Sequence, residues 1–382
     1  MTKHAIIPVA RKGASYLSCI KNVPSGIELR SIAMSNIAVL TSGGDSPGMN
    51  AAVLSVARNA AYYGMSLIGI KHGYNGLLGY SENPEDNYTK LNLDTLLDIA
   101  DLPGTYLRTA RCREFLDPAV REKAARTLKQ LDVKGLVVIG GDGSFQGAMR
   151  LCELGIPCIG IPGTIDNDLS YTEATLGYDT AVNVCVDAVR AIRATSRSHD
   201  RPHVVEVMGR NCGDIALTTA VSTGAEIVVV PEMKWSVDEV ANRLNKLIAM
   251  GNTRATIVVA EGCWASMKPF DVYNYLLPYG KQVWENEPMT SNRFASVLKR
   301  KCGMVEVRDT VVGYVQRGAT PTARDSAFAF EAGAMAVQLL KDGIGNQVIG
   351  VKNARTFHMP IEKALQASRP FNKKLYKLVN SL

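Results

Sequence analysis

The sequence predicts an α/β protein with two Rossmann-like three-layer domains, each built on a mostly parallel sheet. The chain has 382 residues, whereas single hydrophobic cores stop growing near ~250–300 residues. Short β-branched runs alternate with amphipathic helical stretches along most of the sequence, which is the pattern of repeated βαβ units. The apolar runs lack polar alternation, as expected for parallel strands that helices cover on both faces.

The predicted elements follow one another in regular order from residue 37 onwards. A helix over residues 50–63 ends at Gly64, and another over 145–154 ends at Gly155, because glycine readily adopts the left-handed conformation that closes a helix. The predicted strands are residues 37–40, 67–70, 136–139, 158–161, 204–207, 227–230, 256–259 and 310–315.

The composition argues against several classes of protein. No apolar run reaches the ~18 residues of a membrane-spanning helix, so we expect no membrane partner. The eight cysteines form no CxxC pair and the five histidines no HExxH motif, which argues against zinc or disulfide frameworks and favours a reduced cytoplasmic compartment. The net charge of +7 is mild and no basic block is interleaved with aromatics, so we expect no nucleic acid partner.

Residues 1–35 differ in composition from the rest of the chain. They hold five lysines and arginines but a single acid, Glu28, and a second methionine, Met34, precedes the first predicted strand. A disordered leader, or a start codon placed too far upstream, is the preferred interpretation. A basic, acid-poor organelle transit peptide is the alternative.

Polar, glycine-bearing turns follow six of the predicted strands. Because ligands bind beyond the carboxyl ends of the strands in open parallel sheets, these turns predict one phosphate-rich cleft. The turns are TSGGD (41–45), GGDGS (140–144), PGTIDND (162–168), MGR (208–210), EG (261–262) and QRG (316–318).

The GGDGS turn leads into a helix and suits phosphate binding. Glycine lets the backbone approach phosphate oxygens, and a helix start presents free N–H groups. Asp142 can then hold a magnesium ion that bridges phosphates. The alternative is a plain strand-to-helix turn with Ser144 as its cap. In the TSGGD turn, Gly43 and Gly44 can approach a transferring phosphoryl group, although the following Pro47-Gly48 also suits an ordinary turn.

The PGTIDND turn carries two carboxylates and a hydroxyl. Phosphoryl transfer to an alcohol needs an acceptor for the hydroxyl proton; Asp166 suits that role, Thr164 can bind the acceptor, and Asp168 can orient a neighbour. A polar surface turn is the alternative. Several arginines can bind phosphate or remain solvated surface charges: Arg111, Arg201, Arg210, Arg308 and Arg317.

Six motifs in sequence order resemble signatures of the ATP-type phosphofructokinase family: SGGDSPGMN, TARCREF, VVIGGDGS, PGTIDND, VVEVMGR and GYVQRG. The resemblance runs from about residue 36 to the C-terminus. It implies a glycolytic kinase that moves the γ-phosphoryl group of MgATP to the 1-hydroxyl of fructose 6-phosphate. Residues 36–176 plus 315–365 are expected to bind ATP, with Mg²⁺ as cofactor, and residues 177–314 plus 366–382 to bind fructose 6-phosphate.

The resemblance also implies roles for individual residues. Asp166 is expected to be the general base, acting with Thr164, Asp168, Arg111 and Arg210. Arg201 and Arg308 are expected to reach the 6-phosphate from a neighbouring subunit, which implies a homotetramer. The expected nucleotide contacts are Gly44, Arg111, Cys112, Gly141, Asp142, Gly143 and Ser144, with the metal at Asp142. The expected sugar-phosphate contacts from the same subunit are Thr164, Ile165, Asp166, Met208, Gly209, Arg210, Glu261, Tyr314 and Arg317.

Two glycines favour ATP over pyrophosphate as the donor. Pyrophosphate-using relatives usually carry aspartate at position 143 and lysine at position 163, whereas this chain has Gly143 and Gly163. Tyr314 departs from the histidine of many bacterial relatives, and residues 264–300 form a longer segment. The alternatives are a pyrophosphate-dependent phosphofructokinase, a NAD or lipid kinase that shares GGDG, and a catalytically inactive sugar-phosphate sensor.

Overall fold

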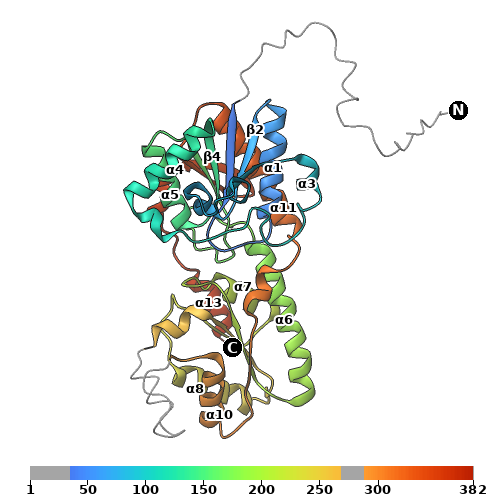
Figure 1. The fold of residues 1–382 in the computed structure, drawn as a ribbon. Helices are drawn as coiled ribbons and strands as arrows, with labels where there is room; N and C mark the ends of the chain where they lie inside the picture. The colour runs from blue at the N-terminus through green and yellow to red at the C-terminus, as the bar shows by residue number, and fades with distance from the viewer. Residues whose placement is uncertain (1–34, 268–287, 382) are drawn as a thin grey trace, which may run out of the picture. The chain divides into compact units, whose positions relative to one another are not determined.

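The computed structural model describes residues 35–267 and 288–381, which contain two sheets covered by helices (Figure 1). The leader expected over residues 1–35 lies outside the described residues apart from Ser35. The same holds for residues 268–287, which make up the larger part of the segment expected over 264–300.

The first sheet has seven strands in the order β11-β10-β5-β4-β1-β2-β3. Its inner pairs are parallel, and only the edge strands β3 and β11 run antiparallel to their neighbours. The strands are β1 (Asn36–Thr41), β2 (Ser66–Ile70), β3 (Tyr88–Lys90), β4 (Val133–Gly140), β5 (Cys158–Pro162), β10 (Gln347–Lys352) and β11 (Arg355–Pro360).

Helices cover both faces of this sheet. Val39 and Leu40 are adjacent on β1 and both fully buried, yet they belong to different apolar clusters, because successive strand side chains point to opposite faces. The cluster with Val39 is closed by α1 (Met49–Tyr62) and α11 (Ala323–Lys341). The cluster with Leu40 is closed by α4 (Pro118–Gln130) and α5 (Asp142–Glu153), on the other side of the sheet (Figure 1).

Short helical segments lie in the same parts of the chain as the strands of the first sheet. They are η2 (Gly73–Leu78), α2 (Pro84–Asn87), α3 (Leu93–Leu97), η3 (Arg113–Leu116) and α12 (Ile361–Leu365).

The second sheet has four strands in the order β7-β8-β6-β9, all parallel. One continuous apolar cluster joins it to its helices. The strands are β6 (His203–Val207), β7 (Ile227–Val229), β8 (Thr256–Ala260) and β9 (Arg308–Val311). The helical segments are α6 (Tyr178–His199), α7 (Asp214–Thr223), α8 (Val237–Ala249), η4 (Glu261–Ser266), α10 (Ser291–Lys301), η6 (Gly313–Arg317) and α13 (Lys373–Asn380).

The predicted α/β class with mostly parallel sheets is confirmed, although several elements begin or end at other residues than predicted. The strand expected over residues 310–315 ends at Val311, because Gly313 adopts a left-handed conformation (φ 58°) and begins the 3₁₀ segment η6. The helix expected from residue 145 already begins at Asp142. Within residues 35–267 and 288–381, no helix combines the length and apolar character needed to cross a bilayer.

Candidate active site

The glycine turns after β1 and β4 lie side by side at the carboxyl edge of the first sheet. The Ser144 hydroxyl donates to the Ser42 hydroxyl at 2.9 Å, and both side chains are buried. The Gly43 amide donates to the Ala110 carbonyl at 3.3 Å, and the Thr109 hydroxyl donates to the Gly43 carbonyl at 3.0 Å. The segment that leads into Arg111 and Cys112 is therefore attached to the TSGGD turn. The Cys112 thiol is half-buried, and its pKa is raised by that burial.

The GGDGS turn presents an open helix N-terminus. Gly141 precedes the first helical residue, Asp142, and Ser144 already lies inside α5 with its hydroxyl on Ser42. The interpretation of Ser144 as a helix cap is therefore wrong. A Cβ built at Gly141 or Gly143 meets no atom within 4 Å. Free N–H groups beside unfilled space form an arrangement that accepts phosphate oxygens.

Asp142 is the carboxylate best placed to hold a metal at this turn. Its side chain is exposed and accepts a hydrogen bond from Gln146 Nε2 at 2.8 Å. Within residues 35–267 and 288–381, no three His, Cys, Asp or Glu side chains gather into a metal site. One carboxylate is nevertheless sufficient where substrate phosphates supply further ligands, which is how Mg²⁺ is usually bound in kinases. The residues present therefore fit a magnesium ion that arrives with its nucleotide.

The PGTIDND turn is attached to the first sheet by its own backbone. The Gly163 amide donates to the Gly140 carbonyl at 2.9 Å, and the Leu176 amide donates to the Pro162 carbonyl at 2.7 Å. The Thr164 carbonyl accepts from the Thr175 hydroxyl at 2.6 Å. The Asp166 amide donates to Thr164 Oγ1 at 3.2 Å. These bonds fix the turn beside the GGDGS turn.

Asp166 has the electrostatic surroundings of a general base. Burial, followed by the charge of Asp168, raises its pKa to about 6, while the guanidinium of Arg317 opposes this shift. Glu261 and Arg210 add smaller effects of opposite sign. A carboxylate with a pKa nearer neutrality is a better proton acceptor at physiological pH than an ordinary aspartate.

The Asp168 carboxylate interacts electrostatically with Asp142 of the GGDGS turn. Desolvation raises its pKa although the side chain still reaches solvent, and Arg210 opposes the rise while Asp142 adds to it. The predicted base turn and the predicted metal-binding aspartate therefore lie close enough to influence one another.

The turns after β6 and β8 meet directly. The Arg210 amide donates to Glu261 Oε1 at 2.8 Å. Gly209 has φ 131°, and a Cβ at Gly262 would lie 2.0 Å from the Arg210 carbonyl oxygen. Gly262 is therefore needed for the close approach of the two turns, and Gly209 for the backbone conformation of its own turn.

Two residues of η6 connect the second sheet to these turns. Gln316 is fully buried, and its Oε1 accepts from the Met208 amide at 3.2 Å and from the Cys185 thiol at 3.0 Å. The Arg317 guanidinium donates to the Asp45 carbonyl at 2.7 Å. Arg317 therefore lies between the TSGGD turn and Asp166, whose pKa it lowers.

Arg201 and Arg308 lie at the opposite end of the second sheet. His203 at the start of β6 pairs with Arg308 at the start of β9, and both arginines form ion pairs with Glu306. A five-residue strand such as β6 places its two ends on the order of 15 Å apart. The structure therefore places these arginines at the opposite end of β6 from Met208 and Gly209. Tyr314 is 82% exposed.

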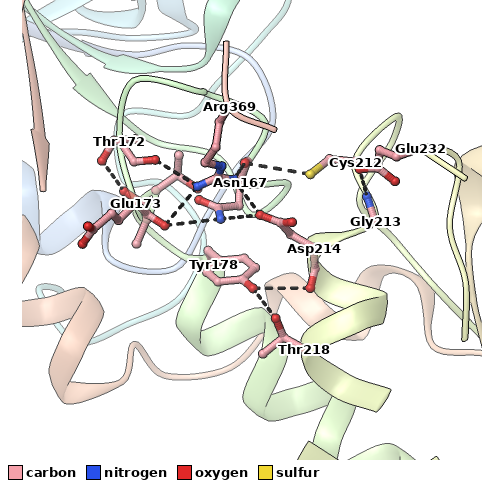
Figure 2. A network of polar contacts seen from close by, with 12 residues as sticks. Asn167, Thr172, Glu173, Tyr178, Cys212, Gly213, Asp214, Thr218, Glu232 and Arg369 are labelled. Atoms are coloured by element: carbon pink, nitrogen blue, oxygen red, sulfur yellow. Dashed lines mark hydrogen bonds and ion pairs between the residues drawn. The ribbon is translucent and has the colours of Figure 1, made fainter. Parts of the chain in front are cut away.

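A polar network behind the PGTIDND turn was not predicted from the sequence (Figure 2). Asn167, Asp214 and Arg369 are joined by hydrogen bonds and an ion pair. Asp214 follows the MGR motif by a few residues, so its proximity to a site motif was a usable signal. Gln316 lies inside the QRG motif, but its burial could not be read from composition. Arg369 lies in no motif and carries no sequence signal.

Comparison with known proteins identifies the family. The profile described as Phosphofructokinase matches residues 36–340. This chain belongs to the phosphofructokinase family. Curated relatives include the ATP-dependent 6-phosphofructokinase 1 of Clostridium perfringens (44% identical) and the ATP-dependent 6-phosphofructokinase of Clostridioides difficile (43% identical). Each alignment covers 91% of this chain and 99% of the relative.

Solved phosphofructokinase structures share the fold. The Saccharomyces cerevisiae phosphofructokinase superposes with a TM-score of 0.73 at 31% identity, covering 87% of this chain and 45% of the yeast chain. This chain thus spans less than half of that larger protein. The pyrophosphate-dependent phosphofructokinase of Marinobacter aquaeolei has a TM-score of 0.71 at 18% identity, covering 91% of this chain and 92% of the other. At that identity the likeness concerns the fold alone.

Proposed function

We propose that this chain is an ATP-dependent 6-phosphofructokinase, which converts fructose 6-phosphate and ATP into fructose 1,6-bisphosphate and ADP in glycolysis. The family match and the curated relatives, which carry that name at 41–44% identity, support this activity. The single observation that carries the mechanism is the half-buried Asp166, whose pKa is raised to about 6.

In this mechanism Asp166 accepts the proton of the sugar 1-hydroxyl as that oxygen attacks the γ-phosphorus. Phosphoryl transfer needs positioning and charge stabilisation more than covalent help from the protein. Thr164 and Ile165 bind the sugar beside Asp166, and Asp168 orients a neighbouring group. Arg111 and Arg210 stabilise the negative charge of the transferring phosphoryl group. When bound, the Mg²⁺ held by Asp142 neutralises part of the phosphate charge.

ATP is the donor in this proposal. Gly44, Arg111, Cys112, Gly141 and Ser144 surround the nucleotide phosphates, and Gly143 leaves the space beside them unfilled. The open space at Gly143 supports a bulky donor, because a Cβ there meets nothing within 4 Å.

The binding of the sugar phosphate is shared between subunits in this proposal. Met208, Gly209, Arg210, Glu261, Tyr314 and Arg317 belong to the subunit that holds the base. Arg201 and Arg308 serve the 6-phosphate of a neighbouring subunit, in a cytoplasmic homotetramer. Their location at the far end of β6 and β9 supports this division, since the strand length separates them from Met208, Gly209 and Arg210 of their own chain. Residues 36–176 plus 315–365 form the ATP-binding domain, and residues 177–314 plus 366–382 form the sugar-phosphate domain.

A donor comparison tests the activity. Purified enzyme with fructose 6-phosphate and Mg²⁺ is supplied with ATP or with pyrophosphate, and fructose 1,6-bisphosphate is measured. We expect rapid product formation with ATP and little with pyrophosphate. A preference for pyrophosphate would support the nearest alternative. Binding of fructose 6-phosphate without turnover from either donor would indicate the inactive sensor.

Subunit complementation tests the shared site. Arg308→Ser is expected to raise the KM for fructose 6-phosphate and Asp166→Asn to lower turnover, whereas hetero-oligomers of the two should recover part of the activity, because some interfaces then hold one intact site. Hetero-oligomers with no recovered activity would mean that Arg308 does not serve a neighbour. A mixture of Asp166→Asn with wild-type chains provides the control for subunit exchange.

A further inference from the structure

We propose that Arg369 is a positioning residue for the reaction, and that it holds the Asp166 turn in place through Asn167 and Asp214. This inference rests on the proposed role of Asp166 as the base. Arg369 lies between α12 and α13, beyond the residues 36–340 that the family profile matches. It does not contact Asp166 itself among the hydrogen bonds and ion pairs of the described residues.

Asn167 is the residue through which the turn can be held. It lies between the two carboxylates of the turn, only 3% exposed, in a left-handed conformation (φ 54°) that asparagine tolerates better than most residues. Its Nδ2 donates to Asp214 Oδ2 at 2.8 Å. The side chain thus bonds to the start of α7, and the direction of the neighbouring Asp166 depends on that attachment.

Arg369 joins three segments through one guanidinium (Figure 2). Its Nη2 donates to Asp214 Oδ2 at 2.6 Å and to the Asn167 carbonyl at 3.1 Å. Its Nη1 donates to the Thr172 carbonyl at 3.1 Å and to the Glu173 carbonyl at 3.4 Å. The planar, fixed fork of arginine can serve several acceptors at once, whereas lysine carries a single charged nitrogen.

The network is sheltered enough for the loss of one member to matter. The Arg369 and Asp214 side chains are 33% and 23% exposed. Without Arg369, the Asp214 carboxylate loses its counter-charge and three backbone carbonyls lose a donor. Asn167 Oδ1 is already buried without a partner in the described part of the chain. Unpaired buried polar groups are costly, so the turn would shift to expose them to water.

Such a shift changes two measurable properties of Asp166. Misplacement of a catalytic group by about 1 Å can cost on the order of 100-fold in rate. The raised pKa of Asp166 is due first to burial, so entry of water would lower it. The charged groups that also act on Asp166, namely Asp168, Arg317, Glu261 and Arg210, lie outside the network and remain in the variants.

The test is a pair of Arg369 variants beside a matched arginine elsewhere. Arg369→Met is expected to lower kcat by about 10–100-fold, with the KM for ATP within about threefold of wild type and the acid limb of kcat moved down from pH 6. Arg369→Lys should recover part of kcat, and it is used alone if Arg369→Met does not fold. Arg193→Met is the control, because Arg193, like Arg369, binds backbone carbonyls together with one carboxylate, here the carbonyls of Thr223 and Gly224 and the carboxylate of Glu226.

The outcomes separate this inference from the proposed function. If Arg193→Met and Arg369→Met lose similar thermal stability but only the latter loses kcat and shifts the acid limb, the positioning role is supported. If kcat per folded enzyme and the acid limb stay as in wild type in Arg369→Met, while Asp166→Asn loses turnover, the positioning role alone is overturned. If Asp166→Asn keeps its turnover, the base assignment fails and this inference fails with it.

Discussion

Gly143 and Gly163 both point to ATP as the donor in the sequence, but the structure gives them different surroundings. A Cβ at Gly143 meets no atom within 4 Å. A Cβ at Gly163 would lie 2.8 Å from Met49 Cε, 3.0 Å from Ile139 Cγ2 and 3.3 Å from the Gly140 nitrogen. Crowding therefore gives a packing reason for Gly163, whereas no packing requirement explains Gly143. Gly143 is therefore the residue that favours ATP as the donor.

The turns that carry these glycines differ in the same way. The GGDGS turn lies at an open helix start, with Asp142 and Gly143 exposed. The PGTIDND turn is bonded to Gly140, Leu176 and Thr175, and the Asn167 network holds it from behind. The phosphates of a nucleotide need unfilled space and free N–H groups, whereas the carboxylate of a general base must keep a fixed orientation. The contrast is expected if the GGDGS turn binds the phosphoryl donor and the PGTIDND turn binds the phosphoryl acceptor. Substitutions in each turn can test it.

The largest expected effect is at Asp166 in the PGTIDND turn. Asp166→Asn should lower kcat by roughly 10²–10⁴-fold, the usual contribution of a positioned general base, while ATP binding changes little. Steady-state kinetics with both substrates measures this. A kcat within about threefold of wild type would remove Asp166 from the mechanism.

The same variant should be more stable than wild type at pH 8. Burial raises the pKa of Asp166 from 3.8 to about 6, so the folded state binds its proton more tightly than the unfolded state does. The free energy of unfolding therefore falls as pH rises from about 4 to 6 and stays lower above it. Removal of the charge should recover at most about 3 kcal/mol, measured by urea unfolding at pH 8 and pH 4. Equal gains at both pH values would contradict this origin.

In the GGDGS turn, Gly143→Asp should strongly reduce the use of ATP without lowering the stability of the protein. A carboxylate about 4 Å from a phosphate charge costs on the order of 4 kcal/mol at an effective dielectric near 20, which weakens nucleotide binding about a thousandfold. The KM for ATP and the thermal midpoint are measured together. Gly143→Ala is the control, because it adds a side chain without a charge. An unchanged KM in Gly143→Asp would defeat the donor argument.

Gly163→Ala and Gly143→Ala should change stability in opposite directions. At residue 163 the added methyl is crowded by Met49 and Ile139, and overpacking of this kind typically costs about 1–3 kcal/mol. At residue 143, in the first turn of α5, alanine should be neutral or stabilise by up to about 1 kcal/mol. Chemical denaturation of both variants measures the difference. A stable Gly163→Ala protein would show that this position has room for the lysine of pyrophosphate-dependent relatives.

The sequence predicted those features that depend on local pattern. The parallel strands, the helices closed by Gly64 and Gly155 and the clustering of the glycine turns follow from short-range periodicity and from backbone freedom at glycine. The start of α5 at Asp142 was missed, because glycines at 141 and 143 hide a helix start.

The remaining features depend on contacts between distant segments. Gln316 contacts Met208 and Cys185 across more than a hundred residues, and Arg369 reaches Asn167 across 202 positions. Nothing in the local sequence of either residue shows its partners. The crowding that distinguishes Gly163 from Gly143 likewise comes from Met49 and Ile139, which lie far from residue 163 in the chain.

The smallest expected effect is the pH dependence of the reaction, which tests whether the general base is Asp166 of the PGTIDND turn. Because Asp166 acts when deprotonated and burial raises its pKa to about 6, kcat should be level above pH 7 and fall toward tenfold per pH unit well below pH 6. A phosphate ester also titrates near ~6, so kcat is measured with both substrates saturating. The Asp166→Asn variant, which lacks the titrating carboxylate, should lose this limb and keep only a low, flat rate. A wild-type acid limb near pH 4 would mean that the reactive carboxylate is open to water, unlike the half-buried Asp166 of this structure.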